Sequence, residues 1–149
     1  MYDDILYPTD GSEASAATFP HVVSQAEAFD ARVHLLYVVN TTYAGVGAAG
    51  KTSVNSLRER GDAVLAEFER RLAESGIDAV ARTREGDPHT EIKGYSDDEV
   101  DMIVMGTRGR GGIEKYLLGS VTEKVVRTAD VPVFTIRTAE SETAAGDDE

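Results

Sequence analysis

The stretch Asp101–Asp130, DMIVMGTRGRGGIEKYLLGSVTEKVVRTAD, decides the fold. It opens with the apolar run Met102–Met105, which a glycine ends and which predicts a short buried parallel strand. The segment Gly106–Ser120 that follows is rich in glycine, and glycine lets backbone amides approach a ligand closely. A helix is predicted next, because the tetrapeptide SVTE at 120–123 has the form of a capping box.

The same segment is basic within an acidic chain. It contains Arg108, Arg110 and Lys115 against the single acid Glu114, whereas the whole chain has 27 acidic and 15 basic residues and a formal net charge of −12. A basic, glycine-rich loop before a helix offers amides, cations and the positive end of a helix dipole. We therefore predict a site for a polyanionic ligand. The alternative, that Ser120 only caps its own helix, explains neither the glycines nor the cations.

The spacing of these glycines is specific. Gly106-x2-Gly109-x9-Gly119-Ser120 matches the G-2x-G-9x-G-S/T signature, and in this respect the chain resembles the ATP-binding branch of the universal stress protein family. The resemblance extends to the opening ILYPTDGS and the closing VPVFTIR, so it covers nearly the whole chain apart from its acidic end.

The resemblance implies an ATP site with Mg²⁺ carried mainly by the phosphates. It implies no catalytic residue and no metal ligand from the protein. The residues implied against the nucleoside are Pro8, Thr9 and Asp10, with Val38 beside the adenine. Those implied around the ribose and the phosphates are Gly106, Arg108, Gly109, Gly119, Ser120, Val121 and Thr122.

Apolar runs alternate with helical patterns along the rest of the chain. Strands are predicted at 5–9, 33–39, 80–83, 102–105 and 131–137, and helices after residue 12, from 54, from 87 and from 120. This alternation predicts an α/β, doubly wound, Rossmann-like parallel sheet in the order 3-2-1-4-5. Its ligand crevice should lie beyond the carboxyl ends of strands one and four, where the winding reverses.

The predicted domain spans residues 1–138. Residues 139–149 carry five acids and no base, which predicts a disordered, solvated tail.

A second phosphate-binding pattern competes with the first. Gly45–Thr52 fits G-x4-G-K-T, but a true phosphate loop follows its strand directly, and residues 40–44 intervene here. Asp101 begins an apolar strand and does not end one, so it cannot take the magnesium-binding place. We interpret this match as a solvated loop of small residues.

The histidines suggest no catalytic or metal site by their spacing. His34 falls inside a predicted strand and reads as a packed side chain, His21 belongs to a helix, and His89 lies at a helix start near the predicted crevice. Asp10 could orient a water for ATP hydrolysis, but no second carboxylate or base accompanies it. Binding without efficient turnover is therefore the favoured function.

Composition excludes several classes of protein. The absence of cysteine excludes disulfides and thiolate zinc sites, and the acidic balance argues against general nucleic-acid binding. The chain has no apolar run of about 18 residues and no signal peptide at its start, so no membrane span and a cytoplasmic location are expected.

We thus expect a stress-response regulator that binds ATP and changes its contacts with a protein partner. The alternatives are a slow ATP hydrolase or a nucleotidyl or phosphoryl transferase using the same crevice, and a dimeric adaptor without nucleotide. The resemblance also implies a homodimer, and pairing through the strand Val131–Arg137 would cover an exposed sheet edge. The alternative is a monomer protected by Pro132 and the acidic tail.

Only four of the basic residues are lysine, and we interpret the acidic surface as an adaptation to high salt. At about 1 M salt the Debye length is about 3 Å, so repulsion among carboxylates is screened. The midpoint of urea unfolding is therefore expected to rise between low and molar KCl. Equal midpoints at the two salt concentrations would contradict this adaptation.

Overall fold

The computed structural model describes residues 1–41, 48–107 and 119–137, and for 48–53 it describes the backbone alone. Arg108, Gly109 and the predicted tail at 139–149 lie outside these ranges.

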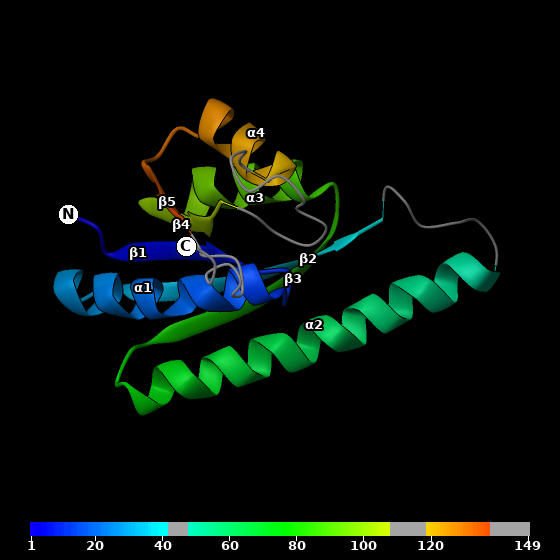
Figure 1. Cartoon of the computed structure of the whole chain (residues 1–149), viewed down its shortest axis with the longest axis horizontal. Coiled ribbons are helices and arrows are strands. Elements are labelled where there is room, and N and C mark those ends of the chain that lie inside the picture. The colour runs from blue at the N-terminus through cyan, green and yellow to red at the C-terminus, as the bar shows by residue number, and fades with distance from the viewer. Residues whose placement is uncertain (42–47, 108–118, 138–149) are drawn as a thin grey trace, which may run out of the picture.

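Five parallel strands form one sheet in the order β3-β2-β1-β4-β5, as the sequence predicts (Figure 1). The elements are β1 (Asp4–Pro8), α1 (Glu13–Phe29), β2 (Arg32–Asn40), α2 (Ala48–Glu74), β3 (Ala79–Gly86), α3 (Pro88–Glu99), β4 (Met102–Gly106), α4 (Ser120–Thr128) and β5 (Val133–Ile136). None of the helices in the described part of the chain is both long enough and apolar enough to cross a membrane.

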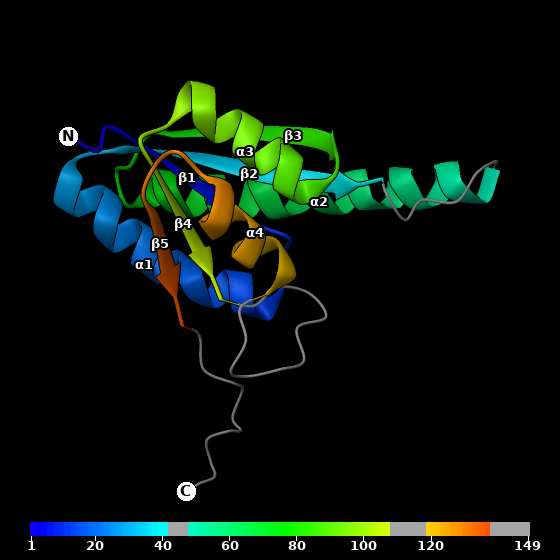
Figure 2. The same cartoon turned by 90° about the horizontal axis from the view of Figure 1, so that it is seen from above.

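Helices cover both faces of the sheet, with α1 and α2 on one side and α3 and α4 on the other (Figures 1 and 2). Successive strand residues point to opposite faces, so β1 supplies Ile5 and Tyr7 to the core under α1 and α2, and Leu6 to the core under α3 and α4. All three side chains are fully buried. The sheet is therefore buried on both sides, as apolar parallel strands require.

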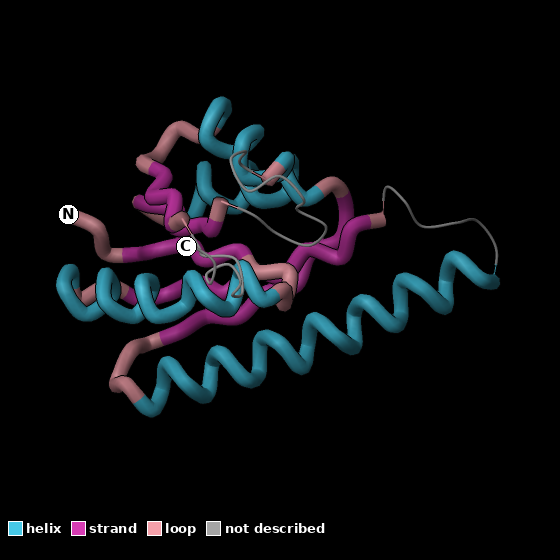
Figure 3. Tube along the Cα trace, in the orientation of Figure 1, coloured by secondary structure: helices cyan, strands magenta, loops and turns pink. Residues whose placement is uncertain are grey.

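The long helix α2 differs from the prediction in its start. It begins at Ala48, so 48–52 of the phosphate-loop match are helical and do not form the solvated loop that we expected (Figure 3). β2 ends at Asn40, which confirms that this match does not follow its strand directly. Farther along, a Cβ on Gly61 would lie 2.4 Å from a ring carbon of Tyr37, so glycine lets α2 pack closely on the sheet.

The buried histidine has a structural environment. His34 is 5% exposed, and its Nδ1 lies 2.6 Å from the Tyr95 hydroxyl and its Nε2 2.8 Å from an Asp4 carboxylate oxygen. These contacts tie β1, β2 and α3 together at the edge of the sheet where the strands begin. The prediction of a packed histidine is confirmed.

Candidate functional site

The sheet opens at its carboxyl edge between β1 and β4. Their pairing joins Ile5 to Met102 and Leu6 to Ile103 and stops there. By contrast, β1 stays paired with β2 as far as Pro8 and Leu36, and β4 with β5 as far as its last residue. The two central strands therefore separate before they end, at the point where the winding of the sheet reverses.

Pro8 explains why the strands separate. Every second residue of a parallel strand bonds to the same neighbour. Asp4 accepts a bond from the amide of Asp101 on the β4 side, whereas Thr9 donates to Leu36 on the β2 side. Pro8 therefore belongs to the β4 side, where the next bond would need the amide hydrogen that proline lacks.

β2 also loses its partner at this edge. The last backbone bond between β1 and β2 runs from the Thr9 amide to the Leu36 carbonyl at 2.9 Å, and the next one, from the Val38 amide to the Thr9 carbonyl, is not formed. Val38 thus turns its amide and carbonyl toward the space that β1 leaves. Its side chain packs against the core under α3 and α4.

The end of β4 is joined to the first turn of α4. The Thr122 hydroxyl donates to the Gly106 carbonyl at 2.8 Å, and the Gly119 amide donates to the Thr107 carbonyl. Thr122 is 4% exposed. These bonds bring the two ends of the glycine signature together across 107–119. They also mean that Thr122 has already used its hydroxyl hydrogen, so only its amide can serve an anion.

The three helices that begin at or beside this edge differ in their caps. Ser12 accepts from the Ser15 amide at the start of α1, and Asp87 accepts from the Thr90 amide at the start of α3. The N-cap of α4 is Gly119, and no side chain caps it. The predicted capping box is therefore wrong: Ser120 is the first helical residue, and Glu123 pairs with Arg127. Among the described residues no side chain accepts from the first amides of α4, so they are available to water or to a ligand.

The turn after β1 satisfies its own polar groups. The Thr9 hydroxyl lies 2.6 Å from that of Ser15 and accepts from the Gly11 amide, and Asp10 accepts from the Ser12 amide. Thr9 is 4% exposed, and its side chain is on the α1 face of the sheet. It consequently turns away from the α3 and α4 face, on which Pro8 and Val38 lie.

His89 connects the two helices on the other face. Its Nε2 lies 2.8 Å from the Thr128 hydroxyl, which itself donates to the Lys124 carbonyl at 2.7 Å. The hydroxyl hydrogen is therefore used, and His89 must donate through Nε2. This geometry gives His89 the role of a tether between α3 and α4.

The structure thus places the predicted residues in three groups at one edge of the sheet. Pro8 ends β1 and Asp10 follows it, and Val38 lies near the end of β2. The Thr122 hydroxyl bonds to Gly106, and the Gly119 amide bonds to Thr107. Arg108 and Gly109 lie outside the described residues.

Sequence reasoning missed two residues beneath this edge. The Tyr7 hydroxyl donates to the Ser15 carbonyl at 2.5 Å and lies 3.2 Å from the Ser15 hydroxyl. The available signal was that Ser15 lies four residues before Phe19, on the helix face that Val22 and Ala26 continue.

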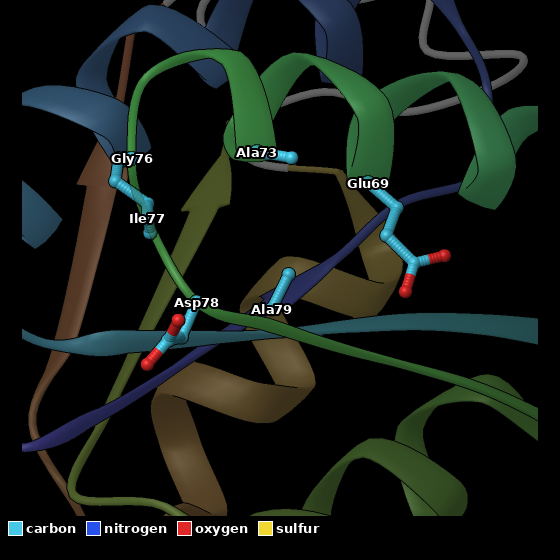
Figure 4. A pocket seen from close by; sticks show the side chains of 6 residues that line it. All are labelled: Glu69, Ala73, Gly76, Ile77, Asp78 and Ala79. Carbon is cyan, nitrogen blue, oxygen red and sulfur yellow. The ribbon is translucent and has the colours of Figure 1, made fainter.

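A separate hollow lies at the opposite edge, between the end of α2 and the start of β3 (Figure 4). Its lining residues are Glu69, Ala73, Gly76, Ile77, Asp78 and Ala79. Figure 4 shows the carboxylates of Glu69 and Asp78 pointing away from each other. This lining contains two acids and no cation, so it does not suit a phosphate-bearing ligand.

Comparison with known proteins settles the family. The model of the universal stress protein family matches residues 1–137. The chain belongs to the universal stress protein family. Universal stress protein MJ0531 of Methanocaldococcus jannaschii is 36% identical over 146 residues, which cover 95% of this chain and 86% of that protein.

Solved structures agree on the fold. The structure of MJ0577, from the same archaeon, superposes with a TM-score of 0.85 at 32% identity and covers 95% of this chain and 99% of its own. A family member from Arabidopsis thaliana with AMP bound has a TM-score of 0.71 at 22% identity, and the match covers 95% of this chain and 98% of that chain. At that identity the plant protein establishes the fold alone.

The buried Tyr7 hydroxyl makes the stability of the fold depend on pH in the alkaline range. Burial raises the pKa of its hydroxyl from 10.0 to about 12, so the fold favours the protonated form. That stabilisation is complete below pH 10 and is lost as the pH rises through 12, a change of about 3 kcal/mol in the free energy of unfolding. The variant Tyr7→Phe should lose stability less steeply over this interval. Urea melts of both proteins measure the free energy of unfolding between pH 9 and 12. An identical pH dependence for the two proteins would contradict the raised pKa of Tyr7.

Proposed function

We propose that the protein binds ATP in the crevice between β1 and β4 and acts in the cytoplasm as a stress-response regulator, with little or no turnover. The observation that carries the proposal is the opening of the sheet at Pro8, beside the start of α4, where no side chain of the described residues caps the first amides. Membership of the universal stress protein family supports the stress-response role.

The end of β2 suits the adenine. Val38 faces the opened space with one amide donor and one carbonyl acceptor that β1 does not use. Adenine offers a matching acceptor and an amino donor along one edge of its ring. Burying a backbone donor and acceptor without partners costs free energy, so a base that satisfies both would be favoured.

The start of α4 suits the phosphates. Its first amides and its dipole favour an anion, and Ser120 adds an exposed hydroxyl. The proposal assigns Ser120 and Val121 to the phosphate chain together with the amide of Thr122. Arg108 and Gly109 are assigned beside the ribose and phosphates from the family signature alone.

Magnesium would be bound through the nucleotide. Among the described residues no group of three or more histidine, aspartate or glutamate side chains could hold a metal ion. In the proposed complex the triphosphate and water would supply most of the ligands of the ion.

The variant Ser120→Asp tests the phosphate site. A carboxylate at a helix start is favourable for the helix, by about 0.3 to 1 kcal/mol, but it repels a phosphate held there. We expect ATP affinity to fall by at least about tenfold while adenosine affinity stays the same, because only the phosphates meet the new charge. Calorimetry with ATP and with adenosine in molar KCl measures both.

The matched control is Ser120→Asn, which has nearly the same shape without the charge. Equal ATP affinities for the Asp and Asn variants would place the phosphates elsewhere. Wild-type protein that neither releases nucleotide on denaturation nor binds added ATP would contradict the function itself. Sustained release of ADP from ATP would replace the regulator with a hydrolase.

We also propose a homodimer through β5. This strand pairs with β4 in the described chain and has no second strand neighbour there. The outer backbone edge of β5 is thus open to a further strand, and the Phe134 side chain beside it is 38% exposed. A second copy of β5 would satisfy that edge and cover the ring.

The variant Phe134→Asp should convert this dimer to a monomer. It places a charge at the proposed contact, where the same charge from the other subunit would face it. The control Val126→Asp adds the same charge at a residue that is 45% exposed and belongs to α4, not to the strand β5. Light scattering at micromolar protein in molar salt measures the mass. A monomeric wild type would rule the dimer out.

A further inference from the structure

A chain of hydrogen bonds runs beneath the crevice, from β1 into the first turn of α1. The Tyr7 hydroxyl bonds to the Ser15 carbonyl at 2.5 Å and lies 3.2 Å from the Ser15 hydroxyl. The Ser15 hydroxyl lies 2.6 Å from that of Thr9, and Thr9 accepts from the Gly11 amide at 3.1 Å. The three side chains are buried, with exposed fractions of 0%, 7% and 4% for Tyr7, Ser15 and Thr9.

Only one set of donor directions gives every hydrogen in this hydrogen-bond chain an acceptor. Tyr7 donates to a carbonyl, so its oxygen can only accept from Ser15. Ser15 in turn accepts from Thr9, and Thr9 accepts from the Gly11 amide. The opposite direction would leave the Thr9 hydrogen without an acceptor among the described contacts. All four bonds therefore point the same way, from Gly11 to the Ser15 carbonyl, and such chains strengthen one another.

The hydrogen-bond chain ends at Gly11, in the turn that contains Asp10. Gly11 has φ of +78°, a conformation that side chains other than glycine rarely adopt. A Cβ there would also lie 2.9 Å from a methyl group of Val64. The Thr9 hydroxyl of the hydrogen-bond chain accepts from the Gly11 amide, and the Asp10 carboxylate accepts from the Ser12 amide of the same turn. The orientation of Asp10 therefore depends on hydroxyl groups that do not themselves face the crevice.

We propose that Ser15 is a positioning residue for nucleoside binding, which it supports by linking Tyr7 to Thr9 and so fixing the turn of Asp10. The role rests on the proposed function of the crevice. Ser15 acts on the nucleoside end of the ligand, because the turn follows β1 and the phosphates are assigned to α4. Loss of its hydroxyl therefore weakens ATP and adenosine binding by the same factor.

The test compares Ser15→Ala with the matched control Thr18→Val. Thr18 is also a buried hydroxyl of α1, but it donates to the Ala14 carbonyl within the helix and does not reach the turn. We expect Ser15→Ala to weaken both ATP and adenosine by about tenfold, and Thr18→Val to weaken neither by more than about twofold. Calorimetry gives the affinities, and NMR hydrogen exchange of the Gly11 amide should show faster exchange only in Ser15→Ala.

A second pair of variants separates positioning from folding. Thr9→Val keeps the shape and removes the hydroxyl, whereas Thr9→Ser keeps the hydroxyl and should restore binding and Gly11 protection. These two variants decide the matter if Ser15→Ala fails to fold. Wild-type binding with equal affinities for Ser15→Ala and Thr18→Val, or for Thr9→Val and Thr9→Ser, would overturn the positioning role alone. A wild type that binds neither ATP nor adenosine would overturn the proposed function, and the positioning role with it.

Discussion

The amide hydrogen that Pro8 lacks is the constraint on which the opening between β1 and β4 depends. A parallel sheet stays closed while each strand supplies a donor to its neighbour at every second residue. Pro8 falls on the β4 side of β1, so the pairing with β4 ends after Leu6 and Ile103. The two strands stay joined at the other end of the sheet, where the Asp101 amide donates a hydrogen bond to the Asp4 carbonyl. The opening is thus a local consequence of one residue.

An opened sheet edge exposes polar backbone groups. The two segments beside it differ in whether side chains accept hydrogen bonds from their backbone amides. The turn after β1 is closed upon itself, because Thr9, Asp10 and Ser12 accept the nearby amides. Among the described residues the start of α4 has no such acceptor, and the Thr122 hydroxyl joins it to the end of β4 by a hydrogen bond to the Gly106 carbonyl. Described side chains therefore accept from the amides on the β1 side of the opening, but not from the first amides of α4. A ligand gains most where the protein has already ordered donors that it leaves unpaired.

Most of the fold follows from patterns that one sequence displays. Apolar runs and helical periods predict the strand order, and the direction of parallel strands brings Asp10 and Gly106 to one edge. The hydrogen-bond partners were beyond that reasoning. A Ser-x-x-Glu pattern fits a capping box whether the helix begins before or after the serine, so the cap of α4 was mispredicted. The bonds of Ser15 depend on which face of α1 meets Tyr7, which only packing decides.

The distribution of charge is compatible with the anion binding that we propose for so acidic a chain. Acids occupy the loops where the strands begin, among them Asp30, Asp78, Asp101 and Asp130. A five-residue strand such as β1 separates that edge from the crevice by about 15 Å, several times the Debye length in molar salt. Helices also end at the acidic edge, and α1 and α3 have no basic residue in their last turns. Carboxylates near the negative ends of helix dipoles are unfavourable in dilute solution. Molar salt screens that repulsion. It also screens long-range charge effects at the proposed crevice, so short-range contacts would select the ligand there.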